Sequence, residues 1–166
     1  MNVVRRRLSL LVFSAALLWA PLEAVWPQAK PPAQQAKDSS FTLSTASHLL
    51  DQLTAGLTAH NQSKMLGAFE LSKMADGPLF RQQVTNLFRQ TGNIRFHFNI
   101  LDVATDATDP SKGIAEVAVE MDVEVLREEV TPPLRKQATL HFVAESGPAG
   151  WKFTDVQPRT FFSTQP

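Results

Sequence analysis

His48 and Asp51 stand three residues apart in a segment whose leucines predict a helix. Side chains three apart on a helix share a face, so this imidazole and carboxylate have the spacing of an acid–base pair. The same spacing is common on solvated helix faces, and catalysis requires burial that shifts a pKa. We therefore expect no catalytic residue in this chain, and keep His48 with Asp51 as the alternative catalytic pair.

The other residue types exclude several kinds of chemistry. The chain has 4 histidines, at no recognised metal-ligand spacing, and no cysteine. Without cysteine there is no disulfide, thiolate nucleophile or cysteine-ligated metal. Tyrosine, a common hydrogen-bond donor to an oxyanion, is also absent. We predict that the protein uses no metal and no cofactor.

Composition places the chain among ordinary globular proteins. Of its 166 residues, 43% are hydrophobic and 19% are charged, which is enough for one domain with a buried core. Lysine plus arginine equals aspartate plus glutamate at 16 each, so no long-range field attracts a polyanion. Nucleic acid is therefore not an expected partner.

Residues 1–24 have the features of a signal peptide. Three arginines at positions 5–7 precede an apolar run at residues 8–20, which is shorter than the roughly twenty apolar residues of a transmembrane helix. The candidate last residues of the signal are Ala20, Ala24 and Ala29. We expect an exported protein, periplasmic or secreted, with no stable membrane span in its mature form. An uncleaved N-terminal membrane anchor is the alternative.

A proline- and glutamine-rich stretch at residues 25–40 follows and is typical of a linker. The folded domain is expected to span residues 41–163. Its first element is an amphipathic helix with Leu49, Leu53 and Leu57 on the buried face, beginning at a Ser44 cap and ending near Ala59.

Two further helices are expected before the first strand. One follows an Asn61 cap and fades near Lys73. The other follows the turn at residues 76–78, where a proline suits the first helical turn, and ends at Gly92. Apolar stripes on such helices require a sheet to cover them.

The clearest strand pattern lies at residues 113–127. Apolar side chains occupy the odd positions from Ala115 to Val125, whereas positions 116, 120, 122 and 124 are acidic. Because successive side chains of a strand point to opposite faces, this strand must have one buried face and one wet face.

Three more strands complete the expected sheet. Residues 94–100 and residues 134–142 alternate in the same way, and residues 151–162 form a less regular strand in which Pro158 indicates a kink or an edge position. Short turns join the strands into an antiparallel meander. The sequence therefore predicts an α+β domain in which three N-terminal helices pack on the concave face of a curved antiparallel four-stranded sheet.

The order of elements and the closing segments of the domain carry a family resemblance. The segments are Gly150-Trp151-Lys152-Phe153-Thr154-Asp155-Val156 and Pro158-Arg159-Thr160-Phe161-Phe162. Over about residues 41–163 the chain resembles the nuclear transport factor 2-like, cone-shaped superfamily, which includes SnoaL-like and ketosteroid-isomerase-like proteins. The resemblance implies the cone fold but little about function. Isomerase-like and dehydratase-like members use tyrosines, so neither catalytic set carries over to this chain.

An apolar pocket is expected between the helices and the concave face. We predict a non-catalytic domain that binds a small apolar ligand, or a protein partner, through its cone and sheet. The alternatives are a lyase or isomerase of the ketosteroid-isomerase-like kind, and a purely structural or dimerisation module whose own phenylalanines fill the cone. The expected pocket wall is Leu53, Leu57, Phe69, Phe80, Val84, Phe96, Phe98, Val119, Met121, Val123, Phe142 and Trp151.

The wet face is a second expected interaction surface. It would place the acidic row near Arg95, His97 and the lysine or arginine side chains of the third strand, with Ile114 and Ala118 between them. Charge rows are often only solvated, but mixed charge with apolar patches also suits an isologous contact. Proteins of the family that the chain resembles often pair through this side, so a homodimer is the expected assembly.

Overall fold

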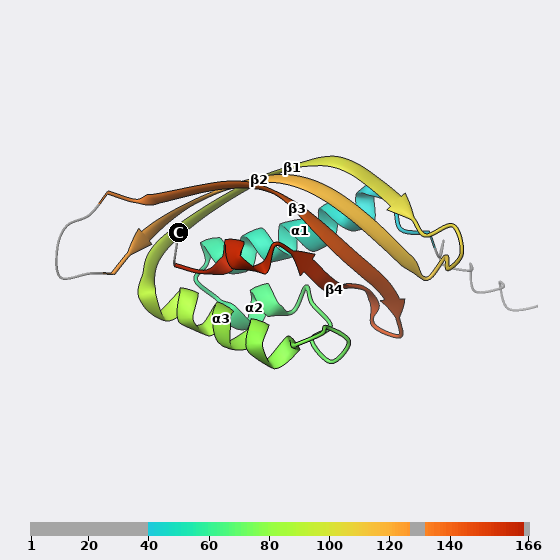
Figure 1. Ribbon diagram of the computed structural model, residues 1–166, viewed down its shortest axis with the longest axis horizontal. Helices are drawn as coiled ribbons and strands as arrows, with labels where there is room; N and C mark the ends of the chain where they lie inside the picture. Colours follow the sequence, from blue (N-terminus) through green and yellow to red (C-terminus); the bar gives the residue numbers. More distant parts are fainter. Residues whose placement is uncertain (1–39, 127–131, 165–166) are drawn as a thin grey trace, which may run out of the picture. The chain divides into compact units, whose positions relative to one another are not determined.

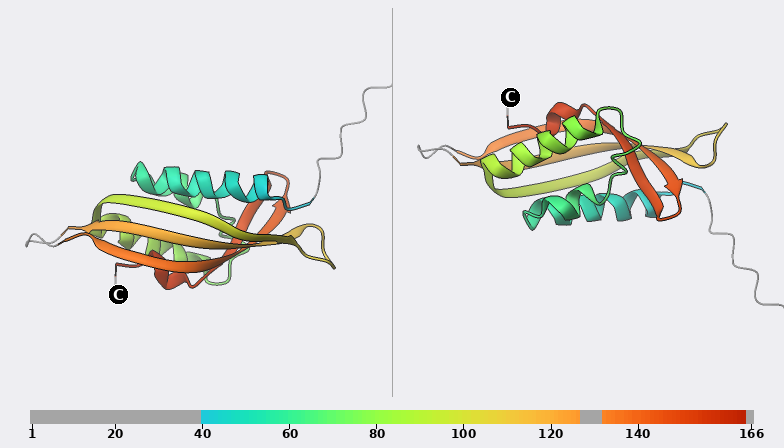
Figure 2. Two further views of the ribbon diagram at one scale, coloured as in Figure 1. Left: turned by 90° about the horizontal axis from the view of Figure 1, so that it is seen from above. Right: turned by 90° about the horizontal axis from the view of Figure 1, so that it is seen from below.

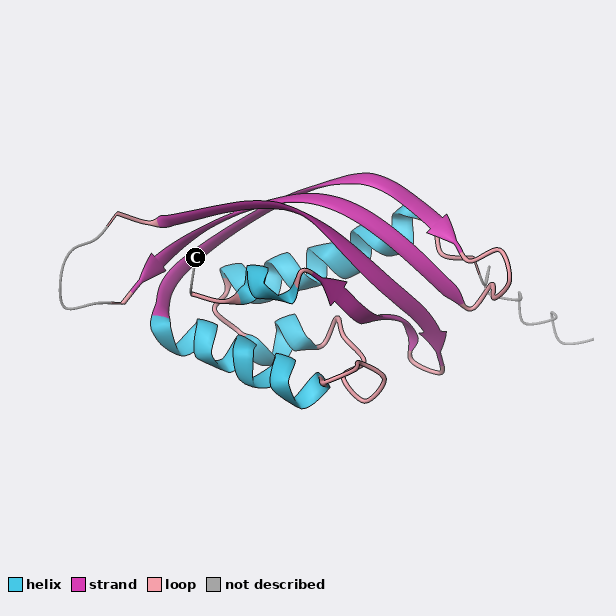
Figure 3. Cartoon of the chain, in the orientation of Figure 1, coloured by secondary structure: helices cyan, strands magenta, loops and turns pink. Residues whose placement is uncertain are grey.

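The computed structural model describes residues 40–126 and 132–164, which lie within one compact unit. Helices α1 (Leu43–Thr58), α2 (Gln62–Leu66) and α3 (Gly77–Gln90) precede strands β1 (Thr91–Thr105), β2 (Lys112–Val125), β3 (Leu134–Gly147) and β4 (Gly150–Gln157). A short 3-10 helix, η1 (Arg159–Phe162), ends the described chain. The sheet arches over the helices (Figures 1 and 3), so the predicted α+β class is confirmed. The expected signal peptide and nearly all of the expected linker lie outside the described residues.

Helix α1 begins two residues earlier than its sequence pattern suggests. Thr42, not Ser44, is the N-cap, because its backbone is extended and its side-chain oxygen accepts a hydrogen bond from the Thr45 amide at 3.3 Å. Ser44 lies inside the helix, so the predicted cap was wrong by two residues. The leucines at 49, 53 and 57 are buried as expected.

The second helix is capped by Asn61, as predicted, but it ends at Leu66 and not near Lys73. After Gly67 the backbone pairs with the sheet: the Phe153 amide donates to the Ala68 carbonyl, and the Glu70 amide donates to the Phe153 carbonyl. A helix cannot continue where its backbone groups are used in this way. The segment also covers the free edge of β4.

Helix α3 starts at the predicted turn, with a proline in its first turn, but ends at Gln90. The expected stop at Gly92 was wrong, because Thr91 is already extended and Gly92 belongs to β1. The chain passes directly from helix to strand, and the Thr91 hydroxyl donates to the Leu87 carbonyl at 2.7 Å. This bond secures the corner between α3 and the sheet.

The four strands form an antiparallel sheet in the order β1-β2-β3-β4, which confirms the predicted meander. In β2 the side chains of Ala115, Val117, Val119, Met121 and Val123 are buried against the helices. We call this the inner face and the opposite one the outer face. Helix α1 packs along β1, and α3 contacts β1 and η1 (Figure 2).

The last strand is shorter than predicted. Strand β4 ends at Gln157, and Pro158, which has no amide proton to donate to a ladder, separates it from η1. Its position at the sheet edge agrees with the sequence. The hairpin before it turns at Gly150, whose φ of 90° is readily adopted only by glycine.

Phenylalanine rings fill the space between sheet and helices. Phe142 and Phe153 lie 4.5 Å apart by ring centroids, and Phe80 contacts Phe162 at 6.0 Å. All four are fully buried or nearly so. Phe161 and Phe162, which were expected on a strand, therefore enter the core from η1.

An ion pair connects the start of η1 to β4. The Asp155 carboxylate accepts hydrogen bonds from the Arg159 guanidinium at 2.6 and 3.1 Å. Burial by itself raises the pKa of this carboxyl, but the bonds from Arg159, Gln157 and the Val156 amide outweigh it and hold the pKa below its ordinary value.

Replacing Asp155 with asparagine should therefore make stability less dependent on acidic pH. The folded-state pKa lies below the unfolded value of about 3.9, so the carboxylate stabilises the fold above about pH 4 and loses this effect as pH falls through the folded-state pKa. The difference in melting temperature between wild type and D155N should shrink towards about pH 2. Thermal unfolding followed by circular dichroism measures it. The variant R159M should show the same loss, whereas a difference that stays constant with pH would contradict the assignment.

Candidate functional site

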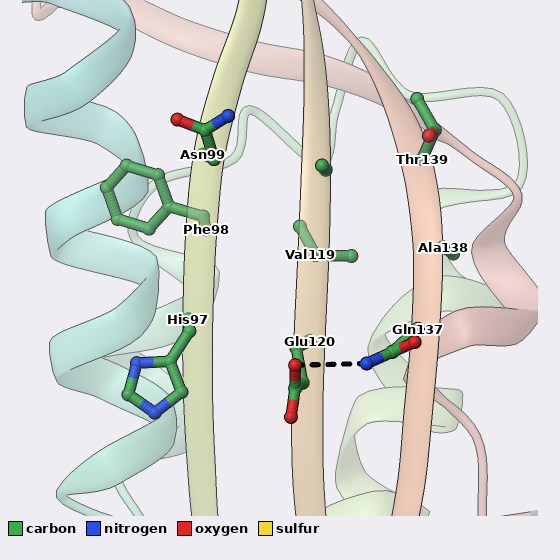
Figure 4. Close-up of a pocket in the computed structure, with 9 residues that line it drawn as sticks. His97, Phe98, Asn99, Val119, Glu120, Gln137, Ala138 and Thr139 are labelled. Carbon is green, nitrogen blue, oxygen red and sulfur yellow. Dashed lines mark hydrogen bonds between the residues drawn. The ribbon is translucent and has the colours of Figure 1, made fainter.

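The outer face of the sheet contains an open hollow of about 550 Å³. It is centred on Ala118, a small residue whose register partners are Asn99 on β1 and Thr139 on β3. Around it stand His97, Glu120 and Gln137, and the Gln137 amide donates to the Glu120 carboxylate at 3.0 Å (Figure 4). We call this the outer hollow. It offers an imidazole, a carboxylate, two amides and a hydroxyl to whatever contacts it.

A row of charges borders the outer hollow. Arg135 donates to the Asp122 carboxylate at 2.8 Å and lies 3.3 Å from the Glu120 carboxylate. The hydrogen bond with Arg135 lowers the pKa of the Asp122 carboxyl. Arg95 on β1 and Arg135 on β3 are both register partners of Asp122, one on each side of β2. Among the described residues Arg95 forms no ion pair. All these groups are solvated, so their pairing adds little to stability.

The opposite end of the outer face is more apolar. Leu101 sits where the β1–β2 register shifts and is 52% exposed, and Ile114 is 48% exposed. Ala104 and Val143 are the register partners of Ile114 on the two neighbouring strands. A more apolar end that also carries Asp102, a hollow of mixed polarity and a charged end therefore succeed one another along the sheet.

His48 and Asp51 are both exposed on α1. The described structure shows no hydrogen bond between them and places neither of them beside the inner face. Their role as an alternative acid–base pair stays a prediction. Among the described residues, no three histidine, aspartate or glutamate side chains gather as metal ligands.

The expected pocket wall lies mostly in the core. Phe98 and Trp151 are partly buried and pack against the core from its margin. The remaining ten are at most 6% exposed: Leu53, Leu57, Phe69, Phe80, Val84, Phe96, Val119, Met121, Val123 and Phe142. Of these twelve, Phe98 and Val119 are also among the residues that line the outer hollow, and Figure 4 shows the Phe98 ring turned towards α1. The apolar-ligand pocket therefore remains a prediction.

Lys136 is the inward residue that sequence reasoning missed. The lysine or arginine side chains of β3 were expected on the outer face, and Arg135 lies there, but Lys136 is the register partner of Met121 and points inward. Its ammonium donates to the Ser163 carbonyl at 2.9 Å and the Thr160 carbonyl at 3.3 Å, and burial lowers its pKa. The alternation of Leu134, Ala138 and Leu140 was the signal that could have placed it.

Comparison with known proteins identifies the fold. No known sequence family and no curated protein matches the chain. A candidate scytalone dehydratase from Novosphingobium aromaticivorans superposes with a TM-score of 0.55 at 8% identity, covering 67% of this chain and 78% of that one. A candidate aromatic ring hydroxylase from the same organism gives 0.53 at 13% identity, covering 67% and 82%. A conserved protein from Planctomyces limnophilus gives 0.53 at 6% identity, covering 67% and 89%.

The described domain thus shares the α+β fold of these solved structures. Identities this low extend the likeness to the fold alone, because this architecture hosts many unrelated functions. Within residues 40–126 and 132–164, no helix has the length and apolar character needed to cross a membrane.

Proposed function

We propose that the domain is a non-catalytic binding module that acts through the outer face of its sheet, and that its partner is a second copy of the chain. The observation that carries this proposal is the outer hollow, which is open and lined by both polar and apolar groups, while the residues expected to line an inner pocket lie in the packed core. We further propose that the module is exported, as its N-terminal sequence indicates.

The charges on β1 support a second copy as the partner. Arg95 and Asp102 lie at opposite ends of the outer face, and within the described structure neither forms an ion pair. A twofold axis across the middle of the sheet, perpendicular to the strands, would bring Asp102 of each copy to Arg95 of the other. The same axis would direct Glu120 of one copy into the hollow at Ala118 of the other. Each copy thus offers both halves of the contact.

Replacing Ala118 with arginine should abolish the pairing. The new side chain would project from an outer-face position into the hollow, where it fills the space that a partner needs without entering the core. Sedimentation velocity at micromolar concentration should show a dimer for the wild type and a monomer for A118R, with an unchanged circular dichroism spectrum. A monomeric wild type under these conditions would contradict the second-copy partner.

Exchanging the two charges tests whether Arg95 of one copy meets Asp102 of the other. The single variants R95D and D102R should each weaken dimerisation by about tenfold or more, because like charges then face each other. The double variant R95D/D102R should recover most of the affinity. The variant R89D, on the exposed side of α3, is the matched control and should leave the dimer unchanged. If the double variant lost as much free energy of dimerisation as the two single variants together, this geometry would be excluded.

A further inference from the structure

An imidazole and a carboxylate lie on neighbouring strands in the outer hollow. His97 on β1 and Glu120 on β2 are register partners, and both line the hollow (Figure 4). Directly opposite side chains of an antiparallel pair have Cβ atoms roughly 5 Å apart, so the imidazole can reach the carboxylate. In the described structure no hydrogen bond joins the two, and Glu120 accepts from the Gln137 amide at 3.0 Å instead. His97 can therefore change its charge beside Glu120 without breaking a bond between them.

The contact proposed above would take the Glu120 carboxylate out of water. In one copy this side chain is 35% exposed. The proposed twofold axis sets two rows of side chains against each other: His97, Glu120 and Gln137 of one copy, and Asn99, Ala118 and Thr139 of the other. The second row carries no charge, so the facing copy supplies no cation to Glu120. Burying a carboxylate without a counter-charge is costly, so the cation must come from the same copy.

Arg135 meets only part of this need. Its Nε atom lies 2.8 Å from the Asp122 carboxylate and 3.3 Å from the Glu120 carboxylate. The hydrogen bond from Arg135 is the main cause of the lowered pKa of the Asp122 carboxyl, so this guanidinium is already engaged. Protonated His97 would supply a second cation on the other side of Glu120. Histidine is the ordinary side chain that changes its charge between about pH 5 and pH 8.

The other charged groups around His97 are few. Besides its register partner, β2 offers Asp122, and β1 itself carries Arg95 two residues away on the same face. Helix α1 packs along β1, and its titratable side chains are His48 and Asp51, neither of which forms a hydrogen bond or ion pair with His97 in the described structure. In a separate copy water screens these exposed charges. Pairing removes that water, so the charge of His97 matters most in the dimer.

We propose that pairing through the outer face takes up protons at His97, so that the dimer tightens as the solution becomes more acidic. This inference rests on the second-copy contact proposed above. The two Glu120 carboxylates lie on either side of the axis, so protons on the two His97 side chains also reduce the repulsion between them. By linkage, a state that binds protons more tightly is favoured below the histidine range of pH and loses this advantage as pH rises through it.

Sedimentation velocity of the full chain over a pH series tests this linkage. The dissociation constant of the dimer should be at least about tenfold lower at about pH 5.5 than at about pH 8, a range in which ordinary aspartate and glutamate side chains stay ionised. Equal affinity at both ends of the series would overturn the linkage and leave the contact standing. Absence of a dimer at every pH would refute the contact itself, and the linkage with it.

Two variants separate the members of the pair. H97N keeps a polar side chain that takes up no proton, so its affinity should stay at the weaker, alkaline value of the wild type throughout the series. E120Q removes the charge that needs a cation, so its affinity should stay near the tighter, acidic value. An H97N dimer that still tightened with acid would overturn the role of His97. An E120Q dimer that kept the full pH dependence would overturn the role of Glu120.

His141 provides the matched control. It is exposed on the same face, and its register partner on β2, Glu116, is also an acid, but it is not among the residues that line the outer hollow. The proposed axis would set it against Arg135 of the other copy, where a proton would oppose pairing. H141N should therefore tighten with acid at least as much as the wild type. Loss of the tightening in H141N but not in H97N would assign the proton to His141 and overturn the proposal.

Discussion

Replacing Phe142 with alanine is expected to lower the free energy of unfolding by about 3–5 kcal/mol. Phe142 is fully buried on the inner face of β3, with its ring 4.5 Å from that of Phe153. Removing it deletes apolar contacts and leaves a void that the surrounding sheet and helices can close only in part. Urea denaturation should show a lower midpoint with an unchanged slope.

The size of the loss in F142A also shows whether the Phe142 ring fills the core or lines an open cavity. If Phe142 faced open space, truncating it would remove few contacts and the loss would be far smaller than the range above. The control is L101A, at a position that is 52% exposed, where the change should stay within about 0.5 kcal/mol. A small loss for F142A would favour an open pocket over the filled cone.

The second large effect is expected for Gly56 replaced by alanine. Helix propensity alone would make this change stabilising by about 0.8–1 kcal/mol, since glycine is a poor residue within a helix. Here a Cβ on Gly56 would lie 2.7 Å from the Cβ of Met65 and nearer still to the Met65 backbone, so α1 and α2 would have to separate. Overpacking of this kind costs about 1–3 kcal/mol or more, and packing should therefore decide the sign.

Thermal and urea unfolding of G56A should thus show a net destabilisation. The matched control is G92A, because a Cβ there would meet nothing closer than the Leu126 side chain at 3.5 Å, an ordinary contact. G92A should cost much less than G56A. A stabilised G56A would mean that the two helices have room to move apart.

The outer hollow and its flanking charges are solvated, so variants there should change association and should alter stability only through the loss of the dimer.

The sequence by itself determined the architecture. The alternation in β2 assigned its two faces residue by residue, and the leucines of α1 and the phenylalanines of α3 assigned the buried sides of two helices. These patterns are reliable because the repeats of two residues in a strand and about 3.6 residues in a helix follow directly from backbone geometry. Pro158 indicated a kink or an edge position, and β4, which lies at the sheet edge, ends just before it.

Tertiary structure decided what each face does. The hollow at Ala118 exists because the β1–β2–β3 register surrounds a small residue with longer ones, and no single strand contains that information. Phe161 and Phe162 reach the core because the chain turns after Gln157 into η1, whereas a continued strand would have carried them along the sheet edge. The placement of Lys136 could be read from the alternation in β3, but its carbonyl partners could not. A sequence period shows which side chains are buried, whereas packing by distant segments decides whether the space beside them is filled.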